Sequence, residues 1–200
     1  MEILQENHIA IWEEAKEFLT IRDNDVHTLH SYQLVKLLLD WNADADKEVC
    51  LLAMMLHDTG WSKIPEDKIL KAFGPNNQYP ELTRAHEVYG MEIASGLLGK
   101  HGYSKEFISQ VTAIIDGHDT TAEARSLEDS IVKDADKLWR YTPHGVATIG
   151  KWFEIGKSEV LDILDGHVLP KLLTKEGKWL AKSFLEVAYT ELNAGKLIKQ

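Results

Sequence analysis

The stretch Val49-Cys-Leu-Leu-Ala-Met-Met-Leu56 is an apolar run that leads directly into His57-Asp58-Thr-Gly60. A run of this length is typical of a buried segment, and glycine is a common stop signal for a helix. A histidine and a carboxylate at the inner end of a buried segment are costly unless something satisfies them. A metal ion would satisfy both, provided that the rest of the chain supplies further ligands.

The composition indicates a soluble globular protein. The 200 residues are 44% hydrophobic and 27% charged, and no apolar stretch approaches the ~20 residues that span a bilayer. The N-terminal residues lack the features of a signal peptide. The single cysteine, Cys50, lies in the apolar run, so we expect a buried free thiol in a reducing compartment. We therefore expect a cytoplasmic protein with no membrane partner.

The charge balance narrows the range of ligands. A net charge of -10 argues against general nucleic-acid binding, which relies on lysine and arginine to neutralise phosphates. It also argues against a small anionic substrate, unless a local positive centre offsets the field of the protein. A divalent metal ion is such a centre.

Nearly every segment has a helical pattern, and none shows sustained alternation of apolar and polar residues. We expect an all-α, single-domain bundle of eight or more helices over residues 1–200. The motif-bearing core would cover about 25–140, with C-terminal helices at 145–195 packed on it. Asp46 and Thr83 are the expected caps of the helices that follow them. The expected helices cover about 3–20, 26–41, 47–57, 66–73, 84–101, 105–116, 126–139, 145–156, 158–173 and 175–193.

Four other predicted helices each carry a polar residue on an apolar face. Residues three, four or seven apart share one face of a helix. By this spacing the polar residues on inward faces are His27, His86, His118 and Asp136. Taken singly, a histidine such as His86 is more often a satisfied core residue than a ligand, and Asp134 competes with Asp136. Together with His57-Asp58, one shared site explains these placements better than five coincidences.

The residue types restrict the metal. Imidazoles and carboxylates without usable thiolates disfavour a structural zinc site built on cysteine. They suit Fe, Mn, Co, Ni or catalytic Zn, and Mg is possible. A set sufficient for one ion, with positions left for water, is His27, His57, Asp58 and Asp136. Adding His86 and His118 makes six side chains, which is enough for two ions if Asp58 bridges them.

With these motifs the sequence resembles the HD superfamily of metal-dependent phosphohydrolases, in particular its small bacterial members. The pattern is a first histidine that opens a helix, an adjacent His-Asp pair and a distant aspartate. It is carried here by His27-Thr-Leu, Leu56-His57-Asp58-Thr-Gly60 and Val132-Lys-Asp-Ala-Asp136-Lys-Leu138. The segments Arg84-Ala-His86-Glu-Val-Tyr-Gly90 and Ile114-Ile-Asp-Gly-His118 are also similar to the family. The resemblance covers about residues 25–140.

The resemblance implies a set of metal ligands and a reaction. The implied ligands of the catalytic metal are His27, His57, Asp58 and Asp136, with His86 and His118 as the extra histidines of binuclear members. Asp136 is preferred to Asp134 because it precedes Lys-Leu. The implied reaction is attack of a metal-activated water on the phosphorus of a nucleotide or other small phosphorylated metabolite.

Individual roles follow from this reaction. Asp58 would orient the water or bridge two ions, and His86 and His118 would hold a second ion or act on the substrate. Lys63 is the cation nearest to the His-Asp pair in sequence, and His30 stands where many relatives have an arginine. Both are therefore candidates for substrate binding.

Two other functions remain open. Some helical proteins with this ligand arrangement hold two irons and insert oxygen into small molecules. A non-catalytic HD interaction domain is the third possibility, which the complete ligand set argues against. The Gly-Tyr-Pro signature of cyclic-dinucleotide phosphodiesterases is absent from the sequence. Several apolar helices leave a homodimer possible.

Overall fold

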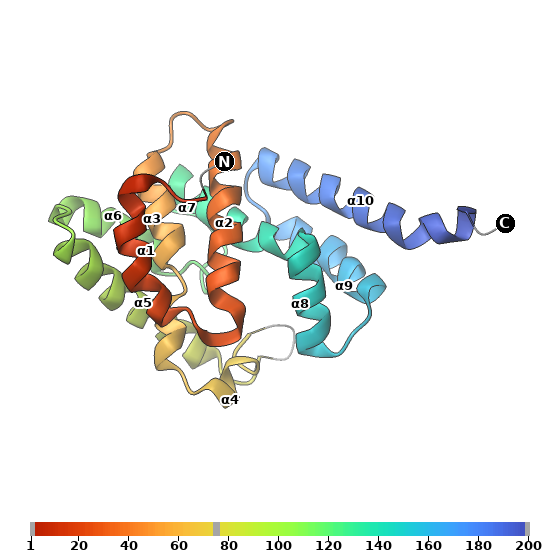
Figure 1. Cartoon of the computed structure of the whole chain (residues 1–200), viewed down its shortest axis with the longest axis horizontal. Helices are drawn as coiled ribbons and strands as arrows, with labels where there is room; N and C mark the ends of the chain where they lie inside the picture. The colour runs from red at the N-terminus through yellow and green to blue at the C-terminus, as the bar shows by residue number, and fades with distance from the viewer. Residues whose placement is uncertain (1–2, 74–76, 199–200) are drawn as a thin grey trace.

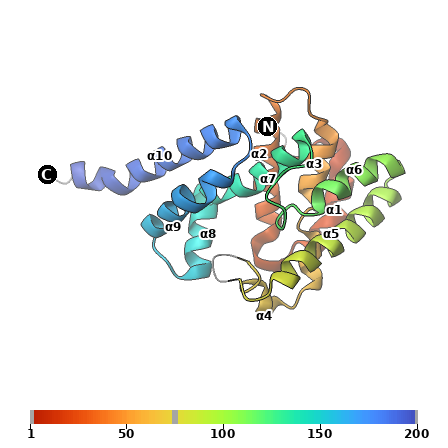
Figure 2. The same ribbon diagram turned by 180° about the vertical axis from the view of Figure 1, so that it is seen from behind.

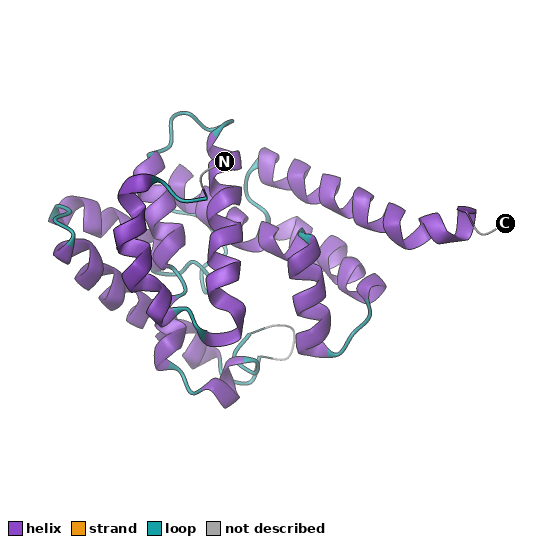
Figure 3. Cartoon of the chain, in the orientation of Figure 1, coloured by secondary structure: helices purple, strands orange, loops and turns teal. Residues whose placement is uncertain are grey.

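The computed structural model describes residues 3–73 and 77–198, and every regular element in these ranges is helical. The expected all-α bundle of eight or more helices is therefore confirmed (Figure 3). The predicted domain also includes residues 1–2, 74–76 and 199–200, which lie outside the described part. The α-helices are α1 (Ile9–Ala15), α2 (Asn24–Leu39), α3 (Lys47–Leu56), α4 (Glu66–Ile69), α5 (Pro80–Lys100), α6 (Lys105–Ile115), α7 (Leu127–Leu138), α8 (Pro143–Phe153), α9 (Lys157–Ile163) and α10 (Lys175–Ile198).

Helix α3 lies at the centre of the bundle. It packs against α2, α6 and α7, with α1 and α5 also in contact (Figures 1 and 2). Asp46 caps its first turn, as predicted, by accepting a hydrogen bond of 3.1 Å from the amide of Val49. Every residue from Val49 to Leu56 is buried, including the free thiol of Cys50. Because each buried Leu or Met contributes about 1.5–3 kcal/mol, this helix anchors the core.

Several predicted helix boundaries were wrong. The helix expected at 3–20 divides into α1 and flanking 3-10 turns, and the one at 158–173 ends at Ile163 before a π turn and a 3-10 turn. Helix α5 begins at Pro80, where proline suits a first helical position. Thr83 therefore lies inside the helix, and its hydroxyl donates to the carbonyl of Ala72 instead of capping.

The C-terminal helices occupy one side of the molecule. Helices α8 and α9 pack together beside the core, and α10 contacts α7 and α9 before its C-terminal part projects away from the body (Figures 1 and 2). None of the described helices is both long enough and apolar enough to cross a membrane.

Gly60 permits the closest approach between the segment after α3 and helix α5. It belongs to a 3-10 turn, Thr59–Lys63 (η4), that packs along α5. A Cβ atom at Gly60 would overlap the carbonyl oxygen of His86 and crowd the amide of Gly90. Glycine is therefore needed because the two backbones meet there. The contact fixes the position of His86 relative to His57-Asp58.

Replacing Gly60 with alanine is expected to destabilise the protein by about 1–3 kcal/mol, because backbone atoms must move to admit the methyl group. Denaturant unfolding measures this free energy. Gly96→Ala is the matched control, since a Cβ at this exposed position in α5 meets nothing within 4 Å. That variant should gain roughly 0.5–1 kcal/mol from helix propensity. Equal stability of the two variants would contradict the close approach.

Candidate metal centre

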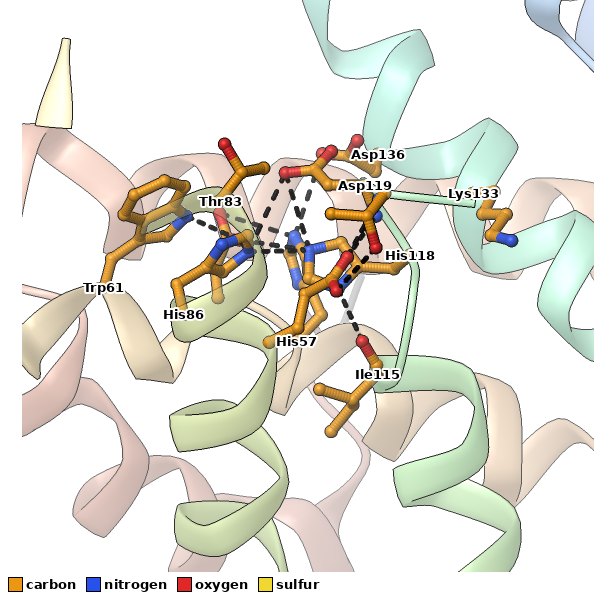
Figure 4. A network of polar contacts seen from close by, with 12 residues as sticks. His57, Trp61, Thr83, His86, Ile115, His118, Asp119, Lys133 and Asp136 are labelled. Carbon is orange, nitrogen blue, oxygen red and sulfur yellow. Dashed lines mark hydrogen bonds and ion pairs between the residues drawn. The ribbon is translucent and has the colours of Figure 1, made fainter. Parts of the chain in front are cut away.

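Five segments deliver polar side chains to one buried cluster (Figure 4). The end of α3 delivers the His57-Asp58 pair, and the other segments come from α2, α5, α7 and the turn after α6. The contacts of α3 with α2, α5, α6 and α7 bring these segments together. The remaining members are His27, His86, His118, Asp119 and Asp136, of which Asp119 is the most exposed.

The first half-site consists of His27, His57, Asp136 and one oxygen of Asp58. The Nε2 atoms of the two histidines lie 3.3 Å apart. Asp136 Oδ1 is 3.4 Å from His27 Nε2 and 3.7 Å from His57 Nε2. Asp58 Oδ2 is 3.6 Å and 3.5 Å from the same two nitrogens. Four donor atoms thus converge on one point.

The second half-site consists of His86, His118, Asp119 and the other oxygen of Asp58. The Nε2 atoms of the two histidines are 3.2 Å apart. Asp58 Oδ1 lies 3.7 Å from His86 Nε2 and 3.5 Å from His118 Nε2. Asp119 Oδ2 is 3.7 Å and 3.8 Å from these nitrogens. Asp58 therefore presents one oxygen to each half-site.

The donor atoms fit a divalent metal ion. Two imidazole nitrogens bound tetrahedrally at about 2.0–2.1 Å lie about 3.3 Å apart, as both Nε2 pairs do. The Nδ1 atoms of His57 and His118 each lie 2.8 Å from a backbone carbonyl oxygen, of Met54 and Ile115 respectively. An Nδ1–H that donates to a carbonyl leaves the Nε2 lone pair free for a metal. Both half-sites therefore have suitable ligands.

Charges within the cluster are strongly coupled. Burial opposes ionisation of Asp58, but His57, His118 and the other histidines outweigh it and hold the pKa of this carboxyl far below its usual range. Burial likewise opposes a charged His118, yet Asp58 and Asp119 raise its pKa to about 10. Burial and the neighbouring His118 lower the pKa of His86 to about 4. One proton therefore resides on one member of the second pair.

Contacts around the cluster hold its members in place. The ring of Trp61 stacks on His86 with centroids 3.9 Å apart, and its Nε1–H donates to Asp58 Oδ1 at 3.1 Å. The buried carboxylate of Glu87 accepts hydrogen bonds from the amides of Asp119 and Thr120, at 3.0 and 2.9 Å. Glu87 thereby fixes the turn that carries His118 and Asp119.

All six residues predicted as metal ligands lie together in the cluster, and Asp134 does not. The Asp134 carboxylate instead accepts hydrogen bonds from the amides of Leu173 and Thr174, at 2.8 and 2.7 Å, just before α10. Of the predicted substrate-binding residues, His30 packs against His144 with ring centroids 5.1 Å apart, and Lys63 is exposed at the end of η4. Their role in substrate binding stays a prediction.

Asp119 is the member of the cluster that the sequence reasoning missed. It lies beyond the end of α6, where helical periodicity no longer indicates which side chains face inward. The available signal was the adjacent pair His118-Asp119, which repeats the His-Asp pair at the end of α3.

A family model described as HD domain matches residues 25–141, which is more than half of the chain. The chain belongs to the HD domain family. The crystal structure of a predicted HD superfamily hydrolase from an uncultured Thermotogales bacterium has the same fold, with a TM-score of 0.65 and 19% sequence identity. The similarity covers 96% of this chain and 94% of that one. The comparison with curated proteins finds no match.

The two aspartates of the HD domain's Asp134-Ala-Asp136 element are expected to differ in effect. Asp136→Asn should weaken metal binding at least tenfold, because a carboxylate donor is lost from the first half-site. Asp134→Asn should leave metal content unchanged and cost about 1–3 kcal/mol, because an amide NH2 would face the donors before α10. Metal analysis and denaturant unfolding measure the two effects, and the reverse pattern would make Asp134 the ligand.

Metal uptake by the HD domain is expected to release protons at neutral pH. His118, with its pKa raised to about 10, is protonated there and must lose a proton before its Nε2 can bind a metal. Apparent metal affinity should therefore rise as the pH is raised toward 10. Calorimetry in buffers of different ionisation enthalpy counts the protons.

The control for proton release is His101→Gln, since His101 pairs with Glu14 instead of the cluster. This variant should release as many protons as the wild type. A metal affinity independent of pH would contradict metal binding through His118.

Proposed function

We propose that this protein is a metal-dependent hydrolase, and that it acts on a phosphoester of a nucleotide or another small phosphorylated metabolite. The observation that carries the proposal is the pair of half-sites that share Asp58. Membership of the HD domain family and the fold of a relative described as a predicted hydrolase support the general activity. Phosphoester specificity rests on the chemistry of the site.

A divalent metal ion held by the half-sites would supply Lewis acidity and lower the pKa of a bound water toward ~7. The residues of the chain would hold this ion and orient the groups around it. His27, His57 and Asp136 present three donors on one side of Asp58, and the side chains of His86 and His118 present two on the other. With only the first half-site loaded, His86 and His118 would stand beside the ion, where an imidazole can accept or donate a proton.

Cations beside the cluster support a phosphorylated substrate despite the net charge of -10. Arg140 lies 3.4 Å from Asp136 Oδ2 and is partly exposed. Burial lowers the pKa of the neighbouring Lys137, while Asp136 and Asp119 favour its charged form. These side chains offset the acidic residues and would reduce repulsion of an anion at the centre.

Several further expectations belong to the same proposal. We place the protein in the cytosol, in keeping with the buried free thiol of Cys50. Lys63 and His30 remain candidate contacts for the substrate. Neither nucleic acid nor a membrane is a proposed partner, and a homodimer is compatible with the exposed apolar residues of α10, such as Val187 and Leu197.

One observation also favours a second candidate, a binuclear-iron oxygenase of small molecules. Two imidazole pairs that share a bridging carboxylate can hold two iron ions as well as two ions of a hydrolase. The alternatives differ in the metal required and in the consumption of oxygen.

The test is to strip the protein of metal, reload it separately with Mn, Co, Zn, Mg or Fe(II), and assay a panel of phosphoesters. We expect metal-dependent hydrolysis that falls at least roughly 1,000-fold in the His57→Ala and Asp58→Ala variants, because water activation is lost. Lys105→Met, on the surface of α6, is the control and should remain active. Oxygen consumption by the iron-loaded protein, with no hydrolysis under any metal, would favour the oxygenase.

A further inference from the structure

Arg22 is held in a box of aromatic rings near the metal centre. It belongs to a 3-10 turn before α2, Ile21–Asp23 (η3), and has a φ of 57°. Its guanidinium carbon lies 5.5 Å from the ring centroid of Trp61, 4.7 Å from that of Phe73 and 5.2 Å from that of Trp152. These are cation–π distances, so three rings from separate segments fix the guanidinium.

Arg22 also differs from the other arginines in its pairing. The chain has four arginines, and each of the other three has a carboxylate partner, as with Arg84 and Asp116 at 2.5 Å. Within residues 3–73 and 77–198, no acidic group lies within ion-pair distance of Arg22. Its Nε is buried without a hydrogen-bond partner, while the side chain as a whole stays partly exposed. A partly buried guanidinium without a carboxylate partner is an incompletely compensated charge, which is costly in a protein interior.

The unpaired charge lies in the field of the metal centre. Burial lowers the pKa of Arg22 to about 10, while Asp58, Asp119 and Glu66 favour its charged form. The guanidinium is therefore positive at neutral pH. Two of these carboxylates, Asp58 and Asp119, belong to the second half-site. The positive charge of Arg22 therefore interacts with the metal centre.

A series of ring contacts joins both half-sites through the rings that hold Arg22. It runs in order through His86, Trp61, Phe73, Trp152, Trp139 and His27. The two end contacts are short, with centroids 3.9 Å apart at His86 and 4.8 Å apart at His27. Because this aromatic arc packs on one histidine of each half-site, Arg22 is fixed relative to both.

We propose that Arg22 is a specificity-determining residue that binds the oxygens of a phosphate group carried by the substrate of the metal centre. The inference rests on the proposed hydrolase function. An arginine fork matches two phosphate oxygens, and preorganisation by the three rings reduces the entropy lost on binding. The phosphate would pair with a guanidinium that has no carboxylate within ion-pair distance among the described residues.

The test measures binding of inorganic phosphate to the metal-loaded protein by calorimetry. Arg22→Met keeps an apolar side chain in the aromatic box and removes the charge, so phosphate affinity should fall about 10- to 100-fold. Arg22→Lys should restore part of it. Lys105→Met is the matched control for net charge and should bind as the wild type does. Metal content and the unfolding midpoint are measured for every variant, and both should stay near wild-type values.

The possible outcomes separate this inference from the hydrolase proposal. Wild-type affinity in Arg22→Met, or no binding of phosphate by the wild type, would overturn the role of Arg22 whatever the enzyme assay shows. Loss of affinity in Lys63→Met instead would assign the anion to Lys63. Reduced affinity in Arg22→Met, without hydrolysis of any phosphoester, would keep the anion site and reject the hydrolase. Equal affinity for acetate would overturn the preference for phosphate.

Discussion

The structure depends on the burial of helix α3 on all its faces. Its apolar residues from Val49 to Leu56 meet α2, α6 and α7, so the chain that leaves the helix is still inside the protein. His57 and Asp58 therefore enter the core as a direct consequence of hydrophobic packing. The neighbouring helices must then supply groups that satisfy them, because unpaired polar groups in a core are unstable.

Opposite charges within the cluster compensate one another and so satisfy the buried His57 and Asp58. His118 is protonated because the neighbouring carboxylates raise its pKa. His86, beside it, is neutral because burial and His118 lower its pKa. Close contacts between backbones and stacked rings maintain these short distances, as at Gly60 and Trp61. The geometry of the site is thus a property of the packed helices, and the same packing provides the nitrogen and carboxylate donors that a divalent ion requires.

Much of this arrangement could be predicted from the sequence, because helical periodicity states which side of a helix is buried. It placed His86 and Asp136 on inward faces, and the resemblance to the HD family selected Asp136 over Asp134. Periodicity carries no information where helices end. Asp119 follows such an end, and Arg22 lies in a left-handed turn whose surroundings come from distant segments. The surroundings of Arg22 become apparent only when the tertiary contacts are known.

The shared position of Asp58 also has an evolutionary consequence. A substitution at His27 or at His86 alters one half-site and leaves the other with its own donors. A substitution at Asp58 alters both at once, since each of its oxygens faces a different histidine pair. Descendants of this chain could thus lose the donors of one half-site, one mutation at a time, and keep those of the other. A substitution at Asp58 has no such gradual effect, because it changes both half-sites in one step.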